Sequence, residues 1–332
     1  MGVSWAGRRV LVTGADGFIG SHLAERLVAL GAEVRAFCFY NSNGSWGWLD
    51  GSDLEVKQSL DVRLGDIRDA RFVEQAVAGV DVVFHLAALI AIPYSYVAPE
   101  SFVDTNVKGT LNVLEAARRA GCHRVVHTST SEVYGTPHTV PIRESHPLQG
   151  QSPYSATKIA ADKLCEAYHA SFEVPVVTLR PFNTYGPRQS TRAVLPTMLV
   201  QLLSGSREIH LGRLDTKRDL TYVADTVEGF VKAGDVEGIE GEVIQLGVGR
   251  AVAIGDLFDA ACRVLGMAAQ VVQDPGRLRP DASEVLVLLS DPAKAGELLG
   301  WSPETRLEEG LLRTAQWLEA HIHLYEPERY HV

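Results

Sequence analysis

Short apolar runs alternate with longer amphipathic segments through the first half of the chain. Strand-like runs occupy residues 9–13, 33–37, 61–64, 82–86, 124–128 and 176–179, and helical patterns fall near 18–30, 69–78, 100–119 and 153–171. Strands that alternate with helices are typical of a parallel sheet covered by helices on both faces. The pattern predicts an α/β fold with a doubly wound parallel sheet in residues 1–181.

The second half is less regular and contains more proline and glycine. Helical patterns recur near 194–204, 223–233, 254–265, 292–299 and 307–321. We expect 182–215 and 251–322 to form a smaller, mostly helical α/β lobe over the carboxyl ends of the strands, where ligands bind in open α/β sheets. The apolar run at 243–246 is expected to rejoin the main sheet, with about 216–250 in the first domain. Residues 323–332 are expected to form a tail.

Composition excludes several classes of protein. The chain has 332 residues, 46% of them hydrophobic, which is enough for two lobes. Its net charge of −10 disfavours nucleic-acid binding, which usually needs a basic face. The chain contains no run of 18 apolar residues, so no membrane span is predicted. The N-terminus lacks the apolar stretch of a secretory signal, and we therefore expect a cytoplasmic protein. The four cysteines are widely spaced, which favours reduced thiols and no metal site.

A glycine-rich turn joins the first predicted strand to the first predicted helix. Val10–Thr13 runs directly into Gly14, Gly17 and Gly20, which permit a tight turn and a close approach of backbone to pyrophosphate. The amides at the start of the helix would face the phosphates. The sequence therefore predicts a Rossmann-type dinucleotide site that also includes Phe18 and Ile19.

Other cofactor contacts are expected at the ends of the following strands. Asp66 could accept a hydrogen bond from adenine, or it could instead cap the next helix. The small residues after the fourth strand leave room for a dinucleotide, whereas His85 is expected to be a packed strand residue. The predicted cofactor set adds Asn41, Asp66, Ile67, Leu86, Ala87, Ala88 and Asn106.

The end of the second strand bears on the choice between NAD and NADP. An acidic residue usually stands there to hold the ribose 2′-hydroxyl, but this chain has Cys38 followed by Phe39 and Tyr40. No pair of arginines for a 2′-phosphate replaces it, so NAD is favoured over NADP. The loop with Trp46 and Trp48 could cover the adenosine end or could be a hydrophobic plug on the lobe.

A reactive group of residues follows the fifth strand. Tyr154 and Lys158 are one helical turn apart and project from the same face, where they could contact the cofactor. A nearby ammonium is expected to lower the pKa of the phenol toward working pH. Thr130 would hydrogen-bond the same sugar hydroxyl. Glu132, and with it Ser131, adds an acid or base that alcohol oxidation alone does not need, although Glu132 could also be a structural ion-pair partner.

These residues together resemble the extended short-chain dehydrogenase/reductase family, and within it the nucleotide-sugar 4,6-dehydratases. The similar segments span nearly the whole chain: 13–20, 85–88, 128–135, 153–158, 180–187 and 218–223. The resemblance implies that Tyr154 and Lys158 are the redox pair, that Thr130 assists, and that Glu132 marks a dehydratase. Ser131 stands where dTDP-glucose dehydratases have Asp. The basic residues that GDP-mannose enzymes carry for NADP are absent here.

The resemblance also implies a substrate and an assembly. Segments near 40–50, 148–154 and 183–190 are similar to dehydratases acting on UDP- or GDP-N-acetylglucosamine. The implied substrate-binding residues are Thr130, Asn183, Arg188, Leu195, Arg218 and Arg279, of which the arginines could clamp the diphosphate. Family members are commonly homodimers joined by a four-helix bundle. The helices near 100–118 and 153–170 would form it here, although their apolar stripe could equally pack on the parent sheet.

The sequence leaves other functions open. A UDP-glucuronate decarboxylase can present the same Thr-Ser-Glu beside its redox pair. A nucleotide-sugar 4-epimerase needs no base at C5, so Glu132 would be dispensable. A dinucleotide-binding regulator without catalysis is a further alternative.

Overall fold

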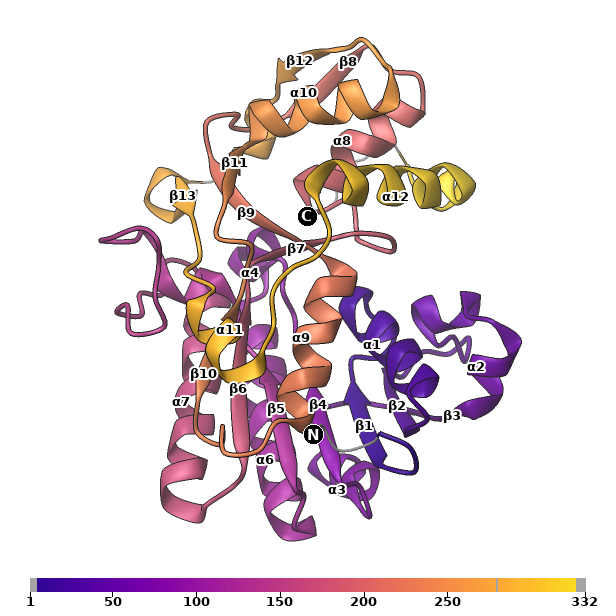
Figure 1. The fold of residues 1–332 in the computed structure, drawn as a ribbon, viewed down its shortest axis with the longest axis vertical. Coiled ribbons are helices and arrows are strands. Elements are labelled where there is room, and N and C mark those ends of the chain that lie inside the picture. The colour runs from indigo at the N-terminus through magenta and orange to yellow at the C-terminus, as the bar shows by residue number, and fades with distance from the viewer. Residues whose placement is uncertain (1–4, 279, 327–332) are drawn as a thin grey trace.

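The computed structural model describes residues 5–278 and 280–326 (Figure 1). A seven-stranded sheet with every neighbouring pair parallel forms the larger lobe, in the order β10-β6-β5-β4-β1-β2-β3. Its strands are β1 (Arg9–Thr13), β2 (Glu33–Phe39), β3 (Leu60–Gly65), β4 (Val82–His85), β5 (Arg124–Thr128), β6 (Val176–Pro181) and β10 (Val243–Leu246). The strand order reverses between β1 and β4, where a crevice opens at the carboxyl ends. The predicted doubly wound sheet is confirmed.

Helices cover both faces of this sheet, and each face has its own apolar core. Val10 and Val12 of β1 pack with α1 (Phe18–Ala29) and α9 (Val223–Asp235), and α11 (Ala293–Leu299) lies beside α9. Leu11 faces the other way, toward α3 (Ala70–Val77), α6 (Gly109–Ala120) and α7 (Pro153–Phe172). Because side chains alternate along a strand, apolar residues at consecutive positions bury both faces.

The smaller lobe stands over the carboxyl ends of the strands (Figure 1). It contains the helices α8 (Val194–Leu203), α10 (Ile254–Leu265) and α12 (Leu307–Ala320). Its strand β9 (Lys217–Tyr222) pairs with β7 (Asn183–Tyr185), β11 (Ala251–Ala253) and β13 (Val287–Leu288), while β8 (Glu208–Leu211) pairs with β12 (Gln270–Gln273). The chain therefore rejoins the larger lobe at α9, and β10 enters the main sheet as expected, but residues 217–222 belong to the smaller lobe.

Several short elements were not predicted from the sequence. They are η1 (Gly47–Gly51), α2 (Leu54–Ser59), α4 (Ile92–Val97), η3 (Ser131–Tyr134), η4 (Pro275–Arg277), η5 (Asp281–Ser283) and η6 (Ile322–Leu324). The helix expected near 100–119 consists of α5 (Pro99–Phe102), a π-helical segment η2 (Val103–Lys108) and α6. Its apolar stripe is divided, since Leu114 is buried in the core while Val103 is 51% exposed.

Two compositional expectations can be compared with the structure. All four cysteines are free thiols, of which Cys38, Cys122 and Cys165 are buried and Cys262 is half-buried. Within 5–278 and 280–326, no helix combines the length and apolar character that crossing a membrane requires. Of the predicted tail, residues 327–332 lie outside the described residues.

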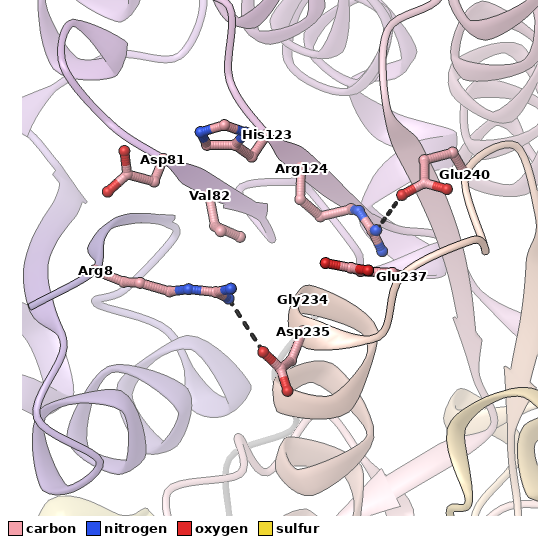
Figure 2. A pocket seen from close by; sticks show the side chains of 9 residues that line it. All are labelled: Arg8, Asp81, Val82, His123, Arg124, Gly234, Asp235, Glu237 and Glu240. Carbon is pink, nitrogen blue, oxygen red and sulfur yellow. Dashed lines mark hydrogen bonds and ion pairs between the residues drawn. The ribbon is translucent and has the colours of Figure 1, made fainter. Parts of the chain in front are cut away.

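A cleft of about 580 Å³ opens at the amino ends of the strands, opposite the smaller lobe (Figure 2). Its charged walls are largely paired: Arg8 contacts Asp235 at 3.2 Å, and the buried Arg124 pairs with Glu240 and donates to the Ala233 carbonyl at 2.9 Å. These pairs tie β5 to the end of α9. Because the predicted site residues lie at the carboxyl ends, this cleft is not the predicted site.

An aromatic contact joins the two lobes beside β2. Trp48 meets Trp317 of α12 edge to face at 5.4 Å between ring centroids, and Trp317 stacks on His321 at 4.2 Å. Of the two interpretations of this loop, the structure supports the hydrophobic plug for Trp48.

We predict that Trp48→Ala lowers the free energy of unfolding by about 1–2 kcal/mol, because a half-buried aromatic side chain loses both burial and a ring contact. Urea denaturation followed by circular dichroism measures the change. Tyr40→Ala in the same loop is the control, since Tyr40 is 63% exposed. Equal losses in the two variants would contradict the interlobe role of Trp48.

Candidate active site

The glycine-rich turn between β1 and α1 forms a cradle that side chains would fill. Gly14 has φ of +70°, and a Cβ on it would lie 2.8 Å from the Ala87 amide nitrogen. A Cβ on Gly20 would lie 2.0 Å from the Gly14 carbonyl oxygen. Only glycine permits these close approaches, which bring the turn after β1 against the loop after β4 and against the first turn of α1. The turn fits the pyrophosphate of a dinucleotide, with Phe18 and Ile19 in the first turn of α1.

A directed chain of hydrogen bonds fixes the loop after β4. Thr110 donates to the Asn106 carbonyl at 2.6 Å, so its oxygen can only accept from Nε2 of His85 at 3.1 Å. Nδ1 of His85 then accepts from Thr13 at 2.8 Å, and Thr13 in turn accepts from the amides of Leu86 and Ala87. Burial lowers the pKa of His85, and the charges of His127 and Lys158 lower it further. His85 is therefore a neutral packed residue, as expected.

Asn106 extends this support along the same loop. Its side chain accepts from the Leu89 amide at 2.8 Å and donates to the Leu89 carbonyl at 2.9 Å and to Thr157 at 3.0 Å. Because Thr157 belongs to α7, Asn106 joins the loop of Ala87 and Ala88 to the helix that carries Tyr154. A direct contact of Asn106 with a cofactor stays a prediction.

The residues expected around the adenosine half have partners within the protein. Asp66 accepts from the Arg68 amide at 2.9 Å and from its guanidinium at 2.6 Å, while Asp69 caps α3, so the alternative that Asp66 caps this helix is wrong. Ile67 accepts from Asn112 through its carbonyl at 3.0 Å. Asn41 donates to the Ser45 carbonyl and accepts from the Ser45 amide, which holds its own loop together.

Tyr154, Thr130 and Glu132 meet at the carboxyl end of β5. Ser152 caps α7 and forms a capping box with Ser155, which starts the helix immediately before Tyr154. Tyr154 is 6% exposed, and the Thr130 side chain is near enough to lower the pKa of its hydroxyl. The Thr130 hydroxyl accepts a hydrogen bond from the Glu132 amide at 3.2 Å. Glu132 therefore lies immediately beside Thr130 after β5. Ser131 between them is buried.

The charge states of Tyr154 and Lys158 differ from the expectation. Burial raises the pKa of Tyr154, the Thr130 side chain lowers it, and the charges of Glu132 and Asp162 raise it again, leaving it above its usual value. Lys158 donates to the Thr128 carbonyl at 2.6 Å, and burial lowers its pKa while Asp162 counteracts this. The expectation that Lys158 brings the pKa of the phenol below its usual value is therefore wrong for the protein groups alone, because burial dominates.

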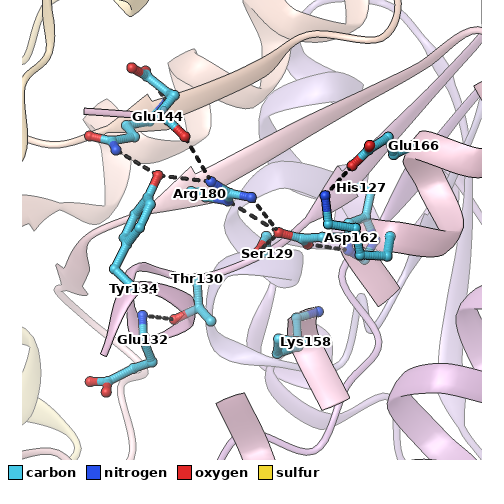
Figure 3. A network of polar contacts seen from close by, with 12 residues as sticks. His127, Ser129, Thr130, Glu132, Tyr134, Glu144, Lys158, Asp162, Glu166 and Arg180 are labelled. Atoms are coloured by element: carbon cyan, nitrogen blue, oxygen red, sulfur yellow. Dashed lines mark hydrogen bonds and ion pairs between the residues drawn. The ribbon is translucent and has the colours of Figure 1, made fainter. Parts of the chain in front are cut away.

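A buried network behind these residues was missed by the sequence analysis (Figure 3). Asp162 of α7 accepts from the Arg180 guanidinium of β6 at 2.9 Å and from the Ser129 hydroxyl at 2.9 Å. Nε2 of His127 lies 3.4 Å from its other oxygen. Arg180 also donates to the Tyr134 hydroxyl at 2.9 Å. The only available signal was that Asp162 follows Lys158 by four residues and so shares its helix face.

The residues predicted to bind substrate lie in different surroundings. Asn183 begins β7, and its side-chain oxygen is buried without a hydrogen-bond partner among the described residues, as a ligand contact would require. Arg218 is buried and contacts Glu284 at 3.1 Å. Leu195 lies in the core at the start of α8. Arg188 binds Glu25 of α1 at 2.7 Å, and Arg279 lies outside the described residues.

We predict that Asp162→Asn lowers the free energy of unfolding by about 3–5 kcal/mol, because it leaves a buried guanidinium without its counter-ion. Urea denaturation at neutral pH measures the loss. Arg143→Gln is the matched control, since its pair with Asp291 at 3.0 Å has an arginine side chain that is 75% exposed, and the cost should stay below about 1 kcal/mol. A loss no larger than that of the control would contradict the structural role of Asp162.

Asp162→Asn should also change how the free energy of unfolding depends on pH in the acidic range. Burial raises the pKa of Asp162, but His127, Arg180 and Ser129 together hold it below its usual value. The stabilisation is thus present above the unfolded pKa of about 3.9 and is lost as pH falls through the lower folded value. Asp162→Asn should flatten this part of the profile.

We predict that Tyr154 ionises only above about pH 10 in protein stripped of bound dinucleotide, because burial raises its pKa above that of a free phenol. Ultraviolet difference titration of the wild type minus Tyr154→Phe isolates its signal. Ionisation near neutral pH would show that Lys158 outweighs burial after all.

Comparison with known proteins places this site in a family. Residues 11–314 match the family model described as GDP-mannose 4,6 dehydratase. The chain is 34% identical to the dTDP-glucose 4,6-dehydratase of Streptomyces antibioticus over 96% of this chain and 94% of that one. It is also 34% identical to the UDP-glucose 4-epimerase of Mycolicibacterium smegmatis over 93% and 98% of the two chains.

The similar solved structures also include both 4,6-dehydratases and 4-epimerases. The dTDP-glucose 4,6-dehydratase of Streptomyces venezuelae, solved with NAD, superposes with a TM-score of 0.84 at 31% identity over 96% of this chain and 99% of that one. The UDP-glucose 4-epimerase of Thermotoga maritima gives 0.84 at 29% identity over 94% and 99%. Several of the similar solved structures contain NAD. The chain therefore belongs to the nucleotide-sugar epimerase/dehydratase family of extended short-chain dehydrogenases/reductases.

Proposed function

We propose that this enzyme is a nucleotide-sugar 4,6-dehydratase that retains NAD and eliminates water across C5 and C6 of a hexose. The observation that carries the proposal is that Glu132 lies beside Thr130 at the carboxyl end of β5, where its amide donates to the Thr130 hydroxyl at 3.2 Å, and that its charge raises the pKa of the buried Tyr154. A proton acceptor for C5 thus stands beside the group that would oxidise C4. None of the ion pairs among the described residues includes Glu132, and its carboxylate points away from the Asp162–Arg180 network (Figure 3).

The residues have separate tasks in this scheme. Tyr154, once ionised, takes the proton of the C4 hydroxyl, while Thr130 holds that oxygen and the positive charge of Lys158 favours the phenolate. NAD held against the turn of Gly14, Gly17 and Gly20 would supply the acceptor for the C4 hydride and the donor of hydride to C6. The C4 ketone acidifies the C5 proton, which Glu132 removes. The C6 hydroxyl then leaves as water with a proton delivered by Glu132 or through Ser131, and a proton derived from solvent is added to C5 when hydride reaches C6.

The proposed substrate is a nucleoside diphosphate hexose, with UDP- or GDP-N-acetylglucosamine as the first choice from the sequence resemblance. Asn183 supports a polar ligand contact because its side-chain oxygen is buried and unpaired in the described structure. Arg218, beside Glu284 under the smaller lobe, would meet the diphosphate. The product would be a 4-keto-6-deoxy sugar nucleotide.

A homodimer is part of the same proposal. The π-helical segment before α6 exposes Val103, and α7 ends with Phe172, which is 53% exposed. Packing of η2, α6 and α7 against their copies would cover these side chains and form a four-helix bundle.

The second candidate is a nucleotide-sugar 4-epimerase. Tyr154, Thr130 and Lys158 suffice for oxidation at C4, and the similar proteins include UDP-glucose 4-epimerases. The two functions differ in whether Glu132 takes part, since returning the hydride to C4 requires no base at C5.

We predict that the purified protein converts one member of a panel of sugar nucleotides to a product that is about 18 mass units lighter without added NAD, because elimination removes water. The panel contains UDP- and GDP-N-acetylglucosamine, dTDP-glucose, GDP-mannose and UDP-glucose. Glu132→Gln should reduce the rate of water loss by about 10²–10⁴-fold, the usual contribution of a positioned acid or base.

Glu144→Gln is the control, because this carboxylate accepts from the Gln245 amide at 3.0 Å and lies behind the site. Conversion at unchanged mass that survives Glu132→Gln would establish the epimerase instead.

A further inference from the structure

The end of β2 lacks the carboxylate that usually holds the adenosine ribose of NAD. The strand ends at Phe39, and Tyr40 and Asn41 follow. The side chain of Asn41 is used within its own loop, where it accepts from the amides of Asn43 at 3.2 Å and Ser45 at 3.0 Å. The preference for NAD over NADP therefore needs another source in this chain.

Asp16 lies on the opposite side of the crevice and faces the end of β2, where the usual carboxylate is missing. It lies in the turn between Gly14 and Gly17, and the amide of Gly14 donates to the Phe37 carbonyl of β2 at 3.0 Å. The Trp48 amide donates to the Asp16 carbonyl at 3.1 Å. A Cβ on Gly47 would lie only 2.8 Å from that of Asp16, so the loop after β2 closes directly against this residue.

The electrostatics agree with this placement. Burial raises the pKa of Asp16, while the amides of Asp16 itself and Phe39 lower it in part, which puts the carboxyl beside the last residue of β2. The pKa of the Cys38 thiol rises to about 12 through burial and through the charges of Asp16 and Asp50. Both carboxylates therefore act on the end of β2.

Of these two acids, Asp50 is already used by the loop. It accepts from the Ser45 hydroxyl at 2.5 Å and from the Trp46 amide at 3.1 Å. The nearby Lys57 donates to the Asp50 carbonyl at 3.3 Å, so this amine is anchored to the backbone of the loop. Asp16 is the remaining carboxylate between the glycine turn and β2.

We propose that Asp16 is the residue that selects NAD over NADP in this chain. Its carboxylate accepts a hydrogen bond from a hydroxyl of the adenosine ribose and repels a phosphate at the 2′ position. The usual acid at the end of the strand is thus replaced by one in the glycine turn that faces the same strand end. This inference rests on the proposed use of NAD but not on whether the enzyme eliminates water or epimerises.

Binding of the two dinucleotides tests the proposal without any turnover. Protein stripped of bound nucleotide is titrated with NAD⁺ and with NADP⁺ by isothermal calorimetry, for the wild type, Asp16→Asn and Asp16→Ser. The wild type should bind NAD⁺ more tightly than NADP⁺. Each variant should reduce the ratio of the affinity for NAD⁺ to that for NADP⁺ by about ten- to a hundredfold, because it loses a charged hydrogen bond to the ribose and the repulsion of the 2′-phosphate. Glu55→Gln removes the same charge from exposed α2 and should leave the ratio unchanged.

Three results would overturn the proposal. One is a ratio that stays within about twofold of the wild type in a folded Asp16 variant, and another is a wild type that prefers NADP⁺. In both cases the proposed chemistry at the sugar still stands, but the second result would replace NAD by NADP in it. A wild type that binds neither dinucleotide would overturn the use of NAD itself, and the proposed function with it. Circular dichroism shows which of the two variants is folded, and the comparison uses the folded one.

Discussion

The buried pair of Asp162 and Arg180 is the interaction on which the arrangement of the site depends. It joins α7 to β6, and through Ser129 it reaches β5. Both side chains are only 4% exposed, so neither charge can be left without the other. Such a pair adds little net stability compared with an apolar core, but it permits only one relation between the helix and the two strands. That relation sets where the groups on α7 meet the groups after β5.

Two consequences follow for the chemistry. Lys158 lies one turn before Asp162 and is drawn onto the Thr128 carbonyl, while Tyr154 lies a further turn back, beside Thr130 and within reach of the charge of Glu132. The proposed proton acceptor for the C4 hydroxyl thus comes from α7 and the proposed acceptor for C5 from the segment after β5, and Asp162 joins these two elements through Ser129. The hydrogen-bond chain through Thr13, His85 and Thr110 does the same for the loop after β4. Together they organise the crevice at the carboxyl ends of the sheet.

Much of the fold was predictable because its signals are local. Apolar runs such as Val10–Thr13 and Val176–Leu179 are long enough to be recognised, and the glycine turn and the Tyr154–Lys158 spacing mark the site directly. Short elements such as α4 and the π-helical segment have too few residues for a period to be seen. The contacts that were missed join residues far apart in the chain: Asp162 with Arg180, Trp48 with Trp317, and Asp16 with the end of β2. The raised pKa of Tyr154 was also missed, since burial is a property of the fold and not of the YxxxK spacing.

The central claim is that a base acts at C5 of a sugar that has been oxidised at C4. Running the reaction in deuterated water and analysing the product by mass spectrometry and proton nuclear magnetic resonance tests this claim most directly. One solvent deuterium is expected at C5 of a 6-deoxy product, while the hydrogen arriving at C6 comes from C4 of the substrate. A product that keeps all of its original carbon-bound hydrogens and differs from the substrate only in configuration at C4 would contradict it.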